Sequence, residues 1–549
     1  MNALICSINS KYIHSSLAPW CLAGGIEEYS PTTNYMVVEG TINEKIEDVL
    51  KRLPVEKYDI IGFCTYIWNK SFVLELCNLI KNKCEIKIAL GGPEVSYNAA
   101  EILENPDIDY VISGEGELPF ALLCTGEKPS KIKGLCYKND GKIIVSEPYI
   151  SEKEPPSPYV DQYFESLKGR IAYIETSRGC PYHCAFCLSG RCGGVRFFDL
   201  EESKKRIEKL SKSGTKTVKF IDRTFNADRK RAREIFNFII DNYGKKLPQG
   251  VCFHFEIEGE LIDSDTIEVL KKAPVGAIQL EIGIQSFNCA TLESINRKTS
   301  IEKLKSNIKA LVNLGNIHIH IDLIAGLPYE DLCSFESSFN QAYELNAHML
   351  QFGFLKMLHG SEMRQNSDKY ECEYSKEPPY QVISTPWLSS REIEIMHTCE
   401  DIFDKMYNSS RFKRTCAYIT EIYDSPFKAF LEFSAYLQDK QSKTLDELTL
   451  EIYSYFSKIP GISKDKLRDL LVIDRLATNR MGTIPEFLKI HSPLTKKLLN
   501  ALEENEETRK PKNTKRAISL LSSMDRYVYV DYTEMNPVTK EYRIYQKNI

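Results

Sequence analysis

Residues 171–187 read IAYIETSRGCPYHCAFC, an apolar run followed by a loop that contains three cysteines. The β-branched and aromatic residues of 171–176 are typical of a buried strand. Cys180, Cys184 and Cys187 follow in the spacing CxxxCxxC, so that three thiols lie within eight residues. Thiolates this close in sequence can bind one metal centre from a single loop. The stretch therefore predicts a metal site at the C-terminal end of a strand.

The donor set separates two kinds of metal centre. A closed zinc site has four protein ligands, typically with a second CxxC or HxxxH pair, and no such pair is evident in the sequence. Three thiolates suit an iron–sulfur cubane in which three irons have protein ligands and the fourth stays open. Cys192 could be a fourth ligand; the alternative is an ordinary loop thiol.

Strands and helices alternate on the C-terminal side of the cysteines. Six such strands predict a partial or full βα barrel over residues 169–365, with its reactive groups at the C-terminal ends of the strands. The strands are expected at 171–176, 217–221, 251–257, 277–285, 317–324 and 350–355.

A second alternation occupies residues 1–150 and predicts a doubly wound, Rossmann- or flavodoxin-like domain. Its five strands are expected at 3–8, 35–38, 60–64, 86–90 and 110–112. A ligand should bind at their C-terminal ends, where glycines let the backbone approach it closely. The candidate residues in those loops are Asn9, Tyr66, Trp68, Gly91, Gly92, Gly114, Glu115 and Gly116.

Two further segments complete the α/β chain. Residues 151–168 contain the run EPPSP and are expected to form a linker. Residues 366–549 are expected to form a mostly helical accessory domain with a terminal β-hairpin at 527–532 and 541–545.

The composition describes an ordinary folded protein of 549 residues, 42% hydrophobic, with a formal net charge of -5. No apolar run reaches the roughly 18 residues that a membrane span needs. The 17 cysteines, an odd number without an export signal, indicate reduced thiols and a cytoplasmic location. The acidic balance gives no electrostatic reason to expect broad nucleic-acid binding.

The cysteine motif resembles that of the radical S-adenosylmethionine (SAM) superfamily, in which CxxxCxxC, with an aromatic residue before the last Cys, follows the first barrel strand. The resemblance implies a 4Fe-4S cluster on the three cysteines whose open iron binds SAM. One electron would then cleave SAM and give a 5′-deoxyadenosyl radical. Such a radical needs a dry barrel interior to exclude side reactions.

The resemblance also implies which residues position SAM. Phe186 would pack against the adenine. Families of this type often carry Gly-Gly-Glu after the second strand, whereas this chain has Asp222 there, which we take as the substitute. Glu281 would bind the ribose, and Glu256 would either contact SAM or serve as a salt-bridge partner. The remaining candidates on the later strands are Gln285, Asp322 and Gly326.

A doubly wound domain before such a barrel resembles the cobalamin-binding subgroup of the superfamily. The resemblance implies that the corrin lies over the loops of residues 1–150, with Tyr66 and Trp68 toward its lower face. The cobalt-binding DxHxxG motif of other cobalamin proteins is absent. His14 could approach the nucleotide tail or cap the next helix. The alternative for the whole domain is a degenerate copy kept for packing.

These features together favour a cobalamin-dependent radical SAM enzyme that methylates an unactivated carbon of a small molecule. An electron donor such as flavodoxin or ferredoxin is expected as a partner. Two alternatives stay open: a radical rearrangement, cyclisation or oxidation without methyl transfer, and a non-catalytic iron–sulfur and corrin sensor. No catalytic residue is predicted.

Overall fold

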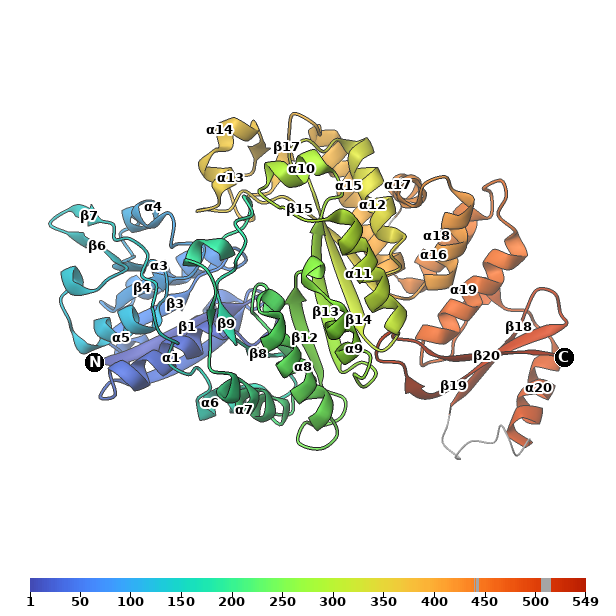
Figure 1. Cartoon of the computed structure of the whole chain (residues 1–549), viewed down its shortest axis with the longest axis horizontal. Helices are drawn as coiled ribbons and strands as arrows, with labels where there is room; N and C mark the ends of the chain where they lie inside the picture. Colours follow the sequence, from blue (N-terminus) through green and yellow to red (C-terminus); the bar gives the residue numbers. More distant parts are fainter. Residues whose placement is uncertain (439, 441–443, 505–514) are drawn as a thin grey trace. The chain divides into compact units, whose positions relative to one another are not determined.

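The computed structural model describes residues 1–438, 440, 444–504 and 515–549 (Figure 1). They form two compact units. The first contains Met1–Glu281, Leu292–Thr299 and Phe354–Pro386, and the second contains Ile282–Thr291, Ser300–Gly353 and Trp387–Ile549. The units do not coincide with the segments expected from the sequence, because their boundary falls inside a strand. Within the described residues, no helix combines the length and apolarity required to cross a bilayer.

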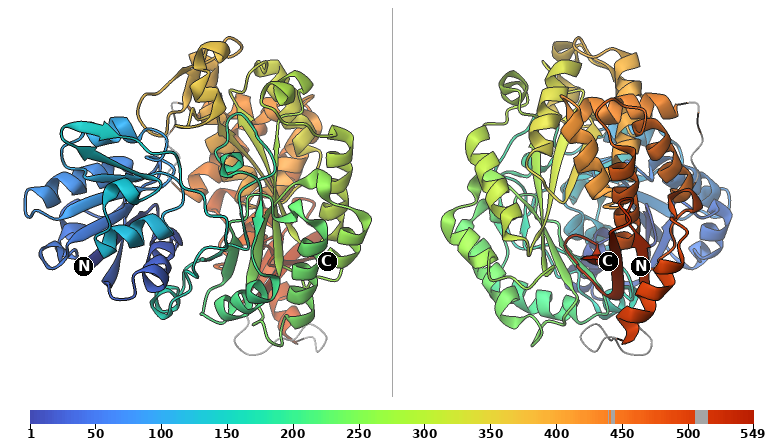
Figure 2. Two further views of the ribbon diagram at one scale, coloured as in Figure 1. Left: turned by 60° about the vertical axis from the view of Figure 1, so that its left-hand side comes forward. Right: turned by 90° about the vertical axis from the view of Figure 1, so that its right-hand side faces the viewer.

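The first unit begins with the predicted doubly wound sheet, which is confirmed. Its five parallel strands run in the order β2-β1-β3-β4-β5, the flavodoxin-like order, in which ligands bind where β1 and β3 diverge. Helices cover both faces (Figure 2). The strands are β1 (Asn2–Asn9), β2 (Asn34–Thr41), β3 (Ile60–Cys64), β4 (Lys87–Gly91) and β5 (Tyr110–Ile112); the helices are α1 (Ala18–Tyr29), α2 (Ile46–Lys51), α3 (Lys70–Lys81), α4 (Ala99–Glu104) and α5 (Glu117–Thr125).

Two antiparallel strands extend this sheet beyond the prediction. They are β6 (Leu135–Asn139) and β7 (Lys142–Ile144), which pair with β5 and with each other. Their turn contains Asp140 and Gly141, both at positive φ, and an Asp-Gly pair is a strong hairpin signal. Both strands are short; β7 is largely exposed, and only the first two residues of β6 are buried, so neither shows the apolar pattern that identified the other five.

The first unit also contains the start of the barrel. Its parallel strands run in the order β8-β11-β12, and β13 begins next to β12. The rings of Phe220 and Phe255 stack 4.2 Å apart, while Lys219, His254 and Glu256 alternate with buried residues along the same two strands. The elements are α6 (Asp161–Ser166), β8 (Ala172–Ile174), β9 (Ser177–Arg178), β10 (Arg196–Phe197), α7 (Leu200–Ser211), β11 (Thr217–Phe220), α8 (Arg229–Asn242), β12 (Cys252–Ile257), α9 (Ser264–Leu270) and β13 (Ile278–Gln285).

A later stretch of chain returns to the first unit and forms small elements. They are α13 (Glu362–Gln365), α14 (Ser367–Tyr370), β16 (Glu373–Tyr374) and β17 (Val382–Ser384).

In the second unit, the rest of β13 lies next to β14 (His318–Ala325), which lies next to β15 (Met349–Phe354). A three-stranded antiparallel sheet ends the chain, where we expected a hairpin. Its extra strand, β18, is short and pairs with β19, the next strand along the chain; its sequence, RAISL, has no regular apolar alternation that would reveal it. The other elements are α10 (Cys289–Ser294), α11 (Ile301–Leu314), α12 (Leu332–Tyr343), α15 (Ser390–Phe403), α16 (Lys413–Ile422), α17 (Pro426–Leu437), α18 (Leu445–Phe456), α19 (Lys464–Thr478), α20 (Pro493–Glu504), β18 (Arg516–Leu520), β19 (Arg526–Met535) and β20 (Tyr542–Asn548).

Candidate functional site

A cavity of about 1020 Å³ lies in the first unit, at the C-terminal ends of β1, β3, β4 and β5. This volume is at the upper end of the range for small-molecule and cofactor sites, about 300–1,000 Å³. All eight residues that the sequence nominated in the N-terminal loops line it. The barrel side supplies Tyr173, Glu175, Ser177, Arg178, Gly179, Ile221 and Arg223. The cavity therefore reaches the strand that leads into the cysteines.

The loop after β1 joins the two sides of this cavity. His14 Nδ1 lies 2.7 Å from the hydroxyl of Tyr173, and the backbone N–H of Ile171 donates to Ile13 O at 2.9 Å. Arg170 donates to the carbonyls of Tyr12 and His14 at 2.9 and 2.7 Å. Burial, together with the nearby cations, lowers the pKa of His14. His14 therefore contacts the barrel from the cavity wall, and its side chain does not cap α1.

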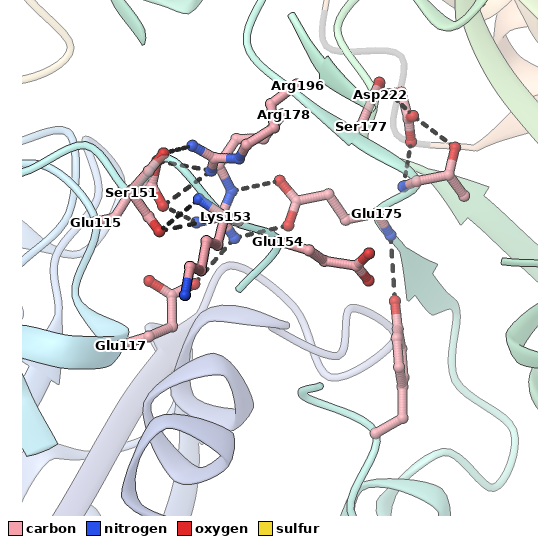
Figure 3. Close-up of polar contacts among 12 residues, drawn as sticks. Glu115, Glu117, Ser151, Lys153, Glu154, Glu175, Ser177, Arg178, Arg196 and Asp222 are labelled. Carbon is pink, nitrogen blue, oxygen red and sulfur yellow. Dashed lines mark hydrogen bonds and ion pairs between the residues drawn. The ribbon is translucent and has the colours of Figure 1, made fainter. Parts of the chain in front are cut away.

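Arg178 lies in an ion-pair network beside the cavity (Figure 3). Its guanidinium donates to Glu115 and Glu117, both at 2.9 Å, and to Glu175 at 2.8 and 2.7 Å. Arg196 donates to the same Glu115 at 2.8 Å. Burial opposes the charge of Arg178, but the carboxylates outweigh burial and raise its pKa. The predicted ligand contact Glu115 is thus already held by two arginines.

Packing requires a glycine at two of the cavity-loop positions, Gly92 and Gly114, but not at Gly91. Gly92 has φ +113°, and a Cβ there would lie 2.4 Å from Thr65 O. Gly114 has φ +90°, and its Cβ would lie 2.2 Å from Tyr149 O. The fold itself therefore requires these two. A Cβ on Gly91 would meet only Ile112, at 3.8 Å, so protein packing leaves room for a side chain at this lining position. That room is the feature expected where a ligand approaches the backbone.

Tyr66 and Trp68 form an aromatic shelf at the end of β3. Their rings stack 4.4 Å apart with an interplanar angle of 6°. The indole N–H of Trp68 donates to Ile8 O at 3.3 Å, which fixes the ring although 46% of the residue is exposed. A stacked, partly exposed pair in a cavity wall suits a large, flat, partly apolar ligand.

The cysteine loop is anchored near its midpoint. The backbone of Ala185 accepts from Met363 N at 3.0 Å and donates to Ile295 O at 2.9 Å. Cys180 is 9% exposed, and Cys184 and Cys187 are half-buried. None of the three is in a disulfide.

Two neighbours suit the sulfurs to metal binding. Cys180 Sγ lies 3.3 Å from the Thr224 hydroxyl. Arg297 Nη1 lies 4.0 Å from Cys184 Sγ, and Arg297 is held by Glu258 at 2.8 Å. Burial raises the pKa of the Cys184 thiol, and the Arg297 cation opposes this rise by favouring the thiolate that a metal needs. The side chain of Cys192, the other ligand considered, lies outside the described residues.

Asp222 does not have the environment expected of a SAM-binding residue. It is 1% exposed. Its carboxylate accepts from Thr176 N at 3.0 Å, Thr176 Oγ1 at 2.7 Å and Ser177 Oγ at 2.6 Å (Figure 3). Burial raises its pKa to about 6, although these hydrogen bonds oppose the rise. Asp222 is a buried brace for the backbone that leads into the cysteine loop, and the geometry does not support the predicted role.

The other acidic candidates of the first unit belong to a charged cluster. Lys219 Nζ lies 3.5 Å from Glu256 and 3.2 Å from Glu281, and His254 Nε2 lies 2.8 Å from Glu281. Burial works to lower the pKa of Lys219, but Glu281 and Glu256 outweigh it and raise the pKa. Lys219 and His254 were not among the residues predicted for the site. The signal that could have found them is the alternation of polar and apolar residues along 217–219 and 252–256, which places the polar side chains on one face of each strand.

Three predicted residues lie in the second unit. Asp322 lies 2.9 Å from His320 Nε2. Gln285 and Gly326 adopt positive φ, 73° and 86°, and a Cβ on Gly283 would lie 2.2 Å from the Gln285 side chain. Phe186, in the first unit, is half-buried in the cysteine loop.

Three family models match successive parts of the chain. The B12 binding domain matches residues 4–123, the radical SAM superfamily matches 174–342, and DUF4080, a protein family of unknown function, matches 368–548. The matches follow the order in which the cavity, the cysteine loop and the C-terminal helices occur.

Curated relatives are about a quarter identical to this chain over the residues that align. The 2-(S-pantetheinyl)-carbapenam-3-carboxylate methyltransferase of Streptantibioticus cattleyicolor is 25% identical over 54% of this chain and 47% of its own length. The cobalamin-dependent radical SAM methyltransferase TokK of Streptomyces tokunonensis is 26% identical over 53% of this chain and 45% of its own length. The chain thus spans about half the length of these two relatives.

Solved structures share the fold at lower identity. OxsB, a cobalamin-dependent SAM radical enzyme, matches with a TM-score of 0.61 and 14% identity over 92% of this chain and 82% of its own. TsrM, a radical SAM methyltransferase from Kitasatospora setae, matches with a TM-score of 0.56 and 16% identity. The match covers 69% of this chain and 76% of the TsrM chain.

Proposed function

We propose that this chain, which matches the radical SAM superfamily model over residues 174–342 and the B12 binding domain model over residues 4–123, is a cobalamin-dependent methyltransferase acting on a carbon atom of a small molecule. One observation carries the proposal. The cavity at the ends of β1, β3 and β4 extends to Ser177, Arg178 and Gly179, the residues directly before Cys180. A ligand held by the N-terminal loops would therefore lie beside the metal site.

The donor chemistry fits the three groups. Cys180, Cys184 and Cys187 would hold the cluster, since they are free thiols on one anchored loop. The eight N-terminal lining residues would hold cobalamin, with Gly91 leaving room and the Tyr66–Trp68 shelf offering a flat face. When bound, the groups would supply one-electron cleavage of SAM and a transferable methyl group. In the first unit, SAM would contact Phe186, Glu256 and Glu281. Gln285, Asp322 and Gly326 of the second unit stay predictions from the motif resemblance.

The chain's own residues would orient the groups and exclude water. Arg170 and Ile171 fix the loop after β1 to the first barrel strand. Arg178 joins the loop after β5 to the strand before the cysteines. These ties keep the walls of the cavity in place, which shields a reactive radical from solvent. An electron donor such as flavodoxin or ferredoxin would supply the reducing electron in a compartment that keeps thiols reduced.

Anaerobic reconstitution tests the proposal. Iron, sulfide and cobalamin are quantified, and 5′-deoxyadenosine formed from SAM is measured in the wild type and in a Cys180→Ala, Cys184→Ala, Cys187→Ala variant. We expect the wild type to bind all three groups and to cleave SAM, and the variant to lose the cluster and the cleavage. Unchanged cleavage in the variant would overturn the proposal. Product mass then separates methyl transfer from rearrangement or oxidation, because only methylation adds one carbon.

A further inference from the structure

A segment of the first unit touches both the cavity loop after β4 and the cysteine loop. We call residues 356–381 the strap; it contains α13, α14 and β16 (Figure 1). Its two ends are held together, because Lys356 pairs with Gln381 as an antiparallel bridge and Met357 N donates to Tyr380 O at 2.9 Å. The DUF4080 match begins inside it, at residue 368.

One contact of the strap is a buried tyrosine on a buried carboxylate. Tyr380 is 1% exposed and Glu94 is 4% exposed. The Tyr380 hydroxyl donates to Glu94 and accepts from Lys70 Nζ at 2.9 Å, while Lys70 lies 3.4 Å from Glu94. The Tyr380 ring also contacts His359, edge-on with the ring centroids 4.9 Å apart, and the Arg364 guanidinium, 4.7 Å from the ring centroid.

Glu94 belongs to the loop that forms a wall of the cavity. Five of the seven residues 91–97 line the cavity, but Glu94 does not, and its side chain is turned to the strap. The strap makes a second contact with this loop at Gly360, where a Cβ would lie 2.2 Å from the ring of Tyr97. The strap thus supports the loop from behind the cavity.

The other contact of the strap is on the cysteine loop. Met363, which is fully buried, donates its backbone N–H to Ala185 O at 3.0 Å. The neighbouring Glu362 accepts from Asn296 Nδ2 at 3.0 Å. Both contacts come from α13, which begins two residues after Gly360. Arg364 Nη1 donates to Met357 O at 2.7 Å and so ties α13 to the start of the strap.

We propose that the strap is a positioning element that holds the cavity loop 91–97 in register with the cysteine loop, and that Tyr380 is its key positioning residue. The inference rests on the proposed function, because those loops would hold the corrin and the cluster. A buried carboxylate needs its donors. With the hydroxyl of Tyr380 removed, Glu94 keeps only Lys70 from this pair of donors, and the loop loses its side-chain hydrogen bond to the strap.

The Tyr380→Phe variant tests this, with Tyr374→Phe as the matched control. Tyr374 also lies against Arg364, at 5.4 Å, but on β16. Hydrogen exchange of residues 91–97 is measured without cofactors, and hydroxocobalamin is titrated by absorbance. We expect Tyr380→Phe to speed exchange of 91–97 and to weaken hydroxocobalamin binding, each about tenfold. In the wild type, hydroxocobalamin should also slow exchange at 362–365, and this effect should vanish in Tyr380→Phe.

The Glu94→Ala variant tests the same Tyr380–Glu94 contact by removing the carboxylate instead of the hydroxyl. If the Tyr380–Glu94 contact carries the effect, the double variant should exchange no faster than the faster single variant. Wild-type exchange and wild-type affinity in Tyr380→Phe would overturn the proposal. If the wild type binds no hydroxocobalamin, the proposed function fails instead, and the exchange of 91–97 still decides the role of the strap.

Discussion

Arg178 Nη1 lies 2.9 Å from Glu115 Oε2 and joins the strand before the cysteine loop to the loop after β5. The side chain of Arg178 is 17% exposed and that of Glu115 is 9% exposed. Two more carboxylates, Glu117 and Glu175, contact the same guanidinium. A single cation therefore neutralises charge from the N-terminal domain and from the barrel.

Arg178→Met should destabilise the first unit by about 3–5 kcal/mol, because it removes the cation that pairs with the largely buried Glu117 and Glu175. Glu115 would keep Arg196. Chemical denaturation followed by circular dichroism measures the change. The matched control is Arg229→Met. Arg229 is 52% exposed and lies 3.6 Å from Asp263, so its loss should cost less than about 1 kcal/mol. Equal losses in the two variants would contradict the assignment.

Gly91 and Gly92 should respond differently to substitution. Gly91→Val should fold normally, because the nearest protein atom to a Cβ is 3.8 Å away, but should weaken hydroxocobalamin binding more than about tenfold. Gly92→Ala should lose stability, because its Cβ meets Thr65 O and its φ is positive. Thermal unfolding and absorbance titration separate the two effects. Normal affinity in Gly91→Val would show that no ligand approaches this position.

Much of the fold could be predicted because its strands are buried and parallel. The runs at 60–64 and 110–112 match β3 and β5 residue for residue, since apolar, β-branched runs signal such strands. β7 and β18 could not be found in this way. β7 is largely exposed, and β18 is short, with no regular alternation of apolar residues.

The candidate site was predictable in position but less so in role. The loops nominated from the sequence all reach the cavity, because the ends of parallel strands meet at one edge. The position of a residue in a motif does not tell which neighbours its side chain contacts. Asp222 turns to Thr176 and Ser177, and Gly92 is required by Thr65; both facts depend on neighbours distant in sequence.

Glu281→Gln should weaken SAM binding by the cluster-loaded protein about tenfold, because a carboxylate accepts from both ribose hydroxyls more strongly than an amide does. Isothermal titration under anaerobic conditions measures the affinity. Glu268→Gln is the control, since the Glu268 side chain is 67% exposed. If both variants bind SAM like the wild type, Glu281 serves only as the partner of Lys219 and His254.

Glu330 should make the stability of the second unit depend on pH. It is fully buried, and its Oε1 accepts from Ser286 at 2.5 Å and from Ser338 at 3.0 Å. Burial raises its pKa to about 7 from the usual 4.5. Between these two pKa values the folded state keeps a proton that the unfolded state releases. Stability should therefore fall as pH rises through this window and stay low above it.

Glu330→Gln should remove this dependence, because the amide stays neutral and its Oε1 can accept from the same two hydroxyls. At pH 8 we expect the variant to be more stable than the wild type by on the order of 2 kcal/mol, and at pH 5 we expect the two to differ little. Denaturant unfolding at both pH values gives the comparison. Glu344→Gln, at an exposed helix end, should leave the pH profile unchanged. Parallel profiles for the wild type and Glu330→Gln would mean that the Glu330 carboxylate is already charged in the folded protein at pH 5.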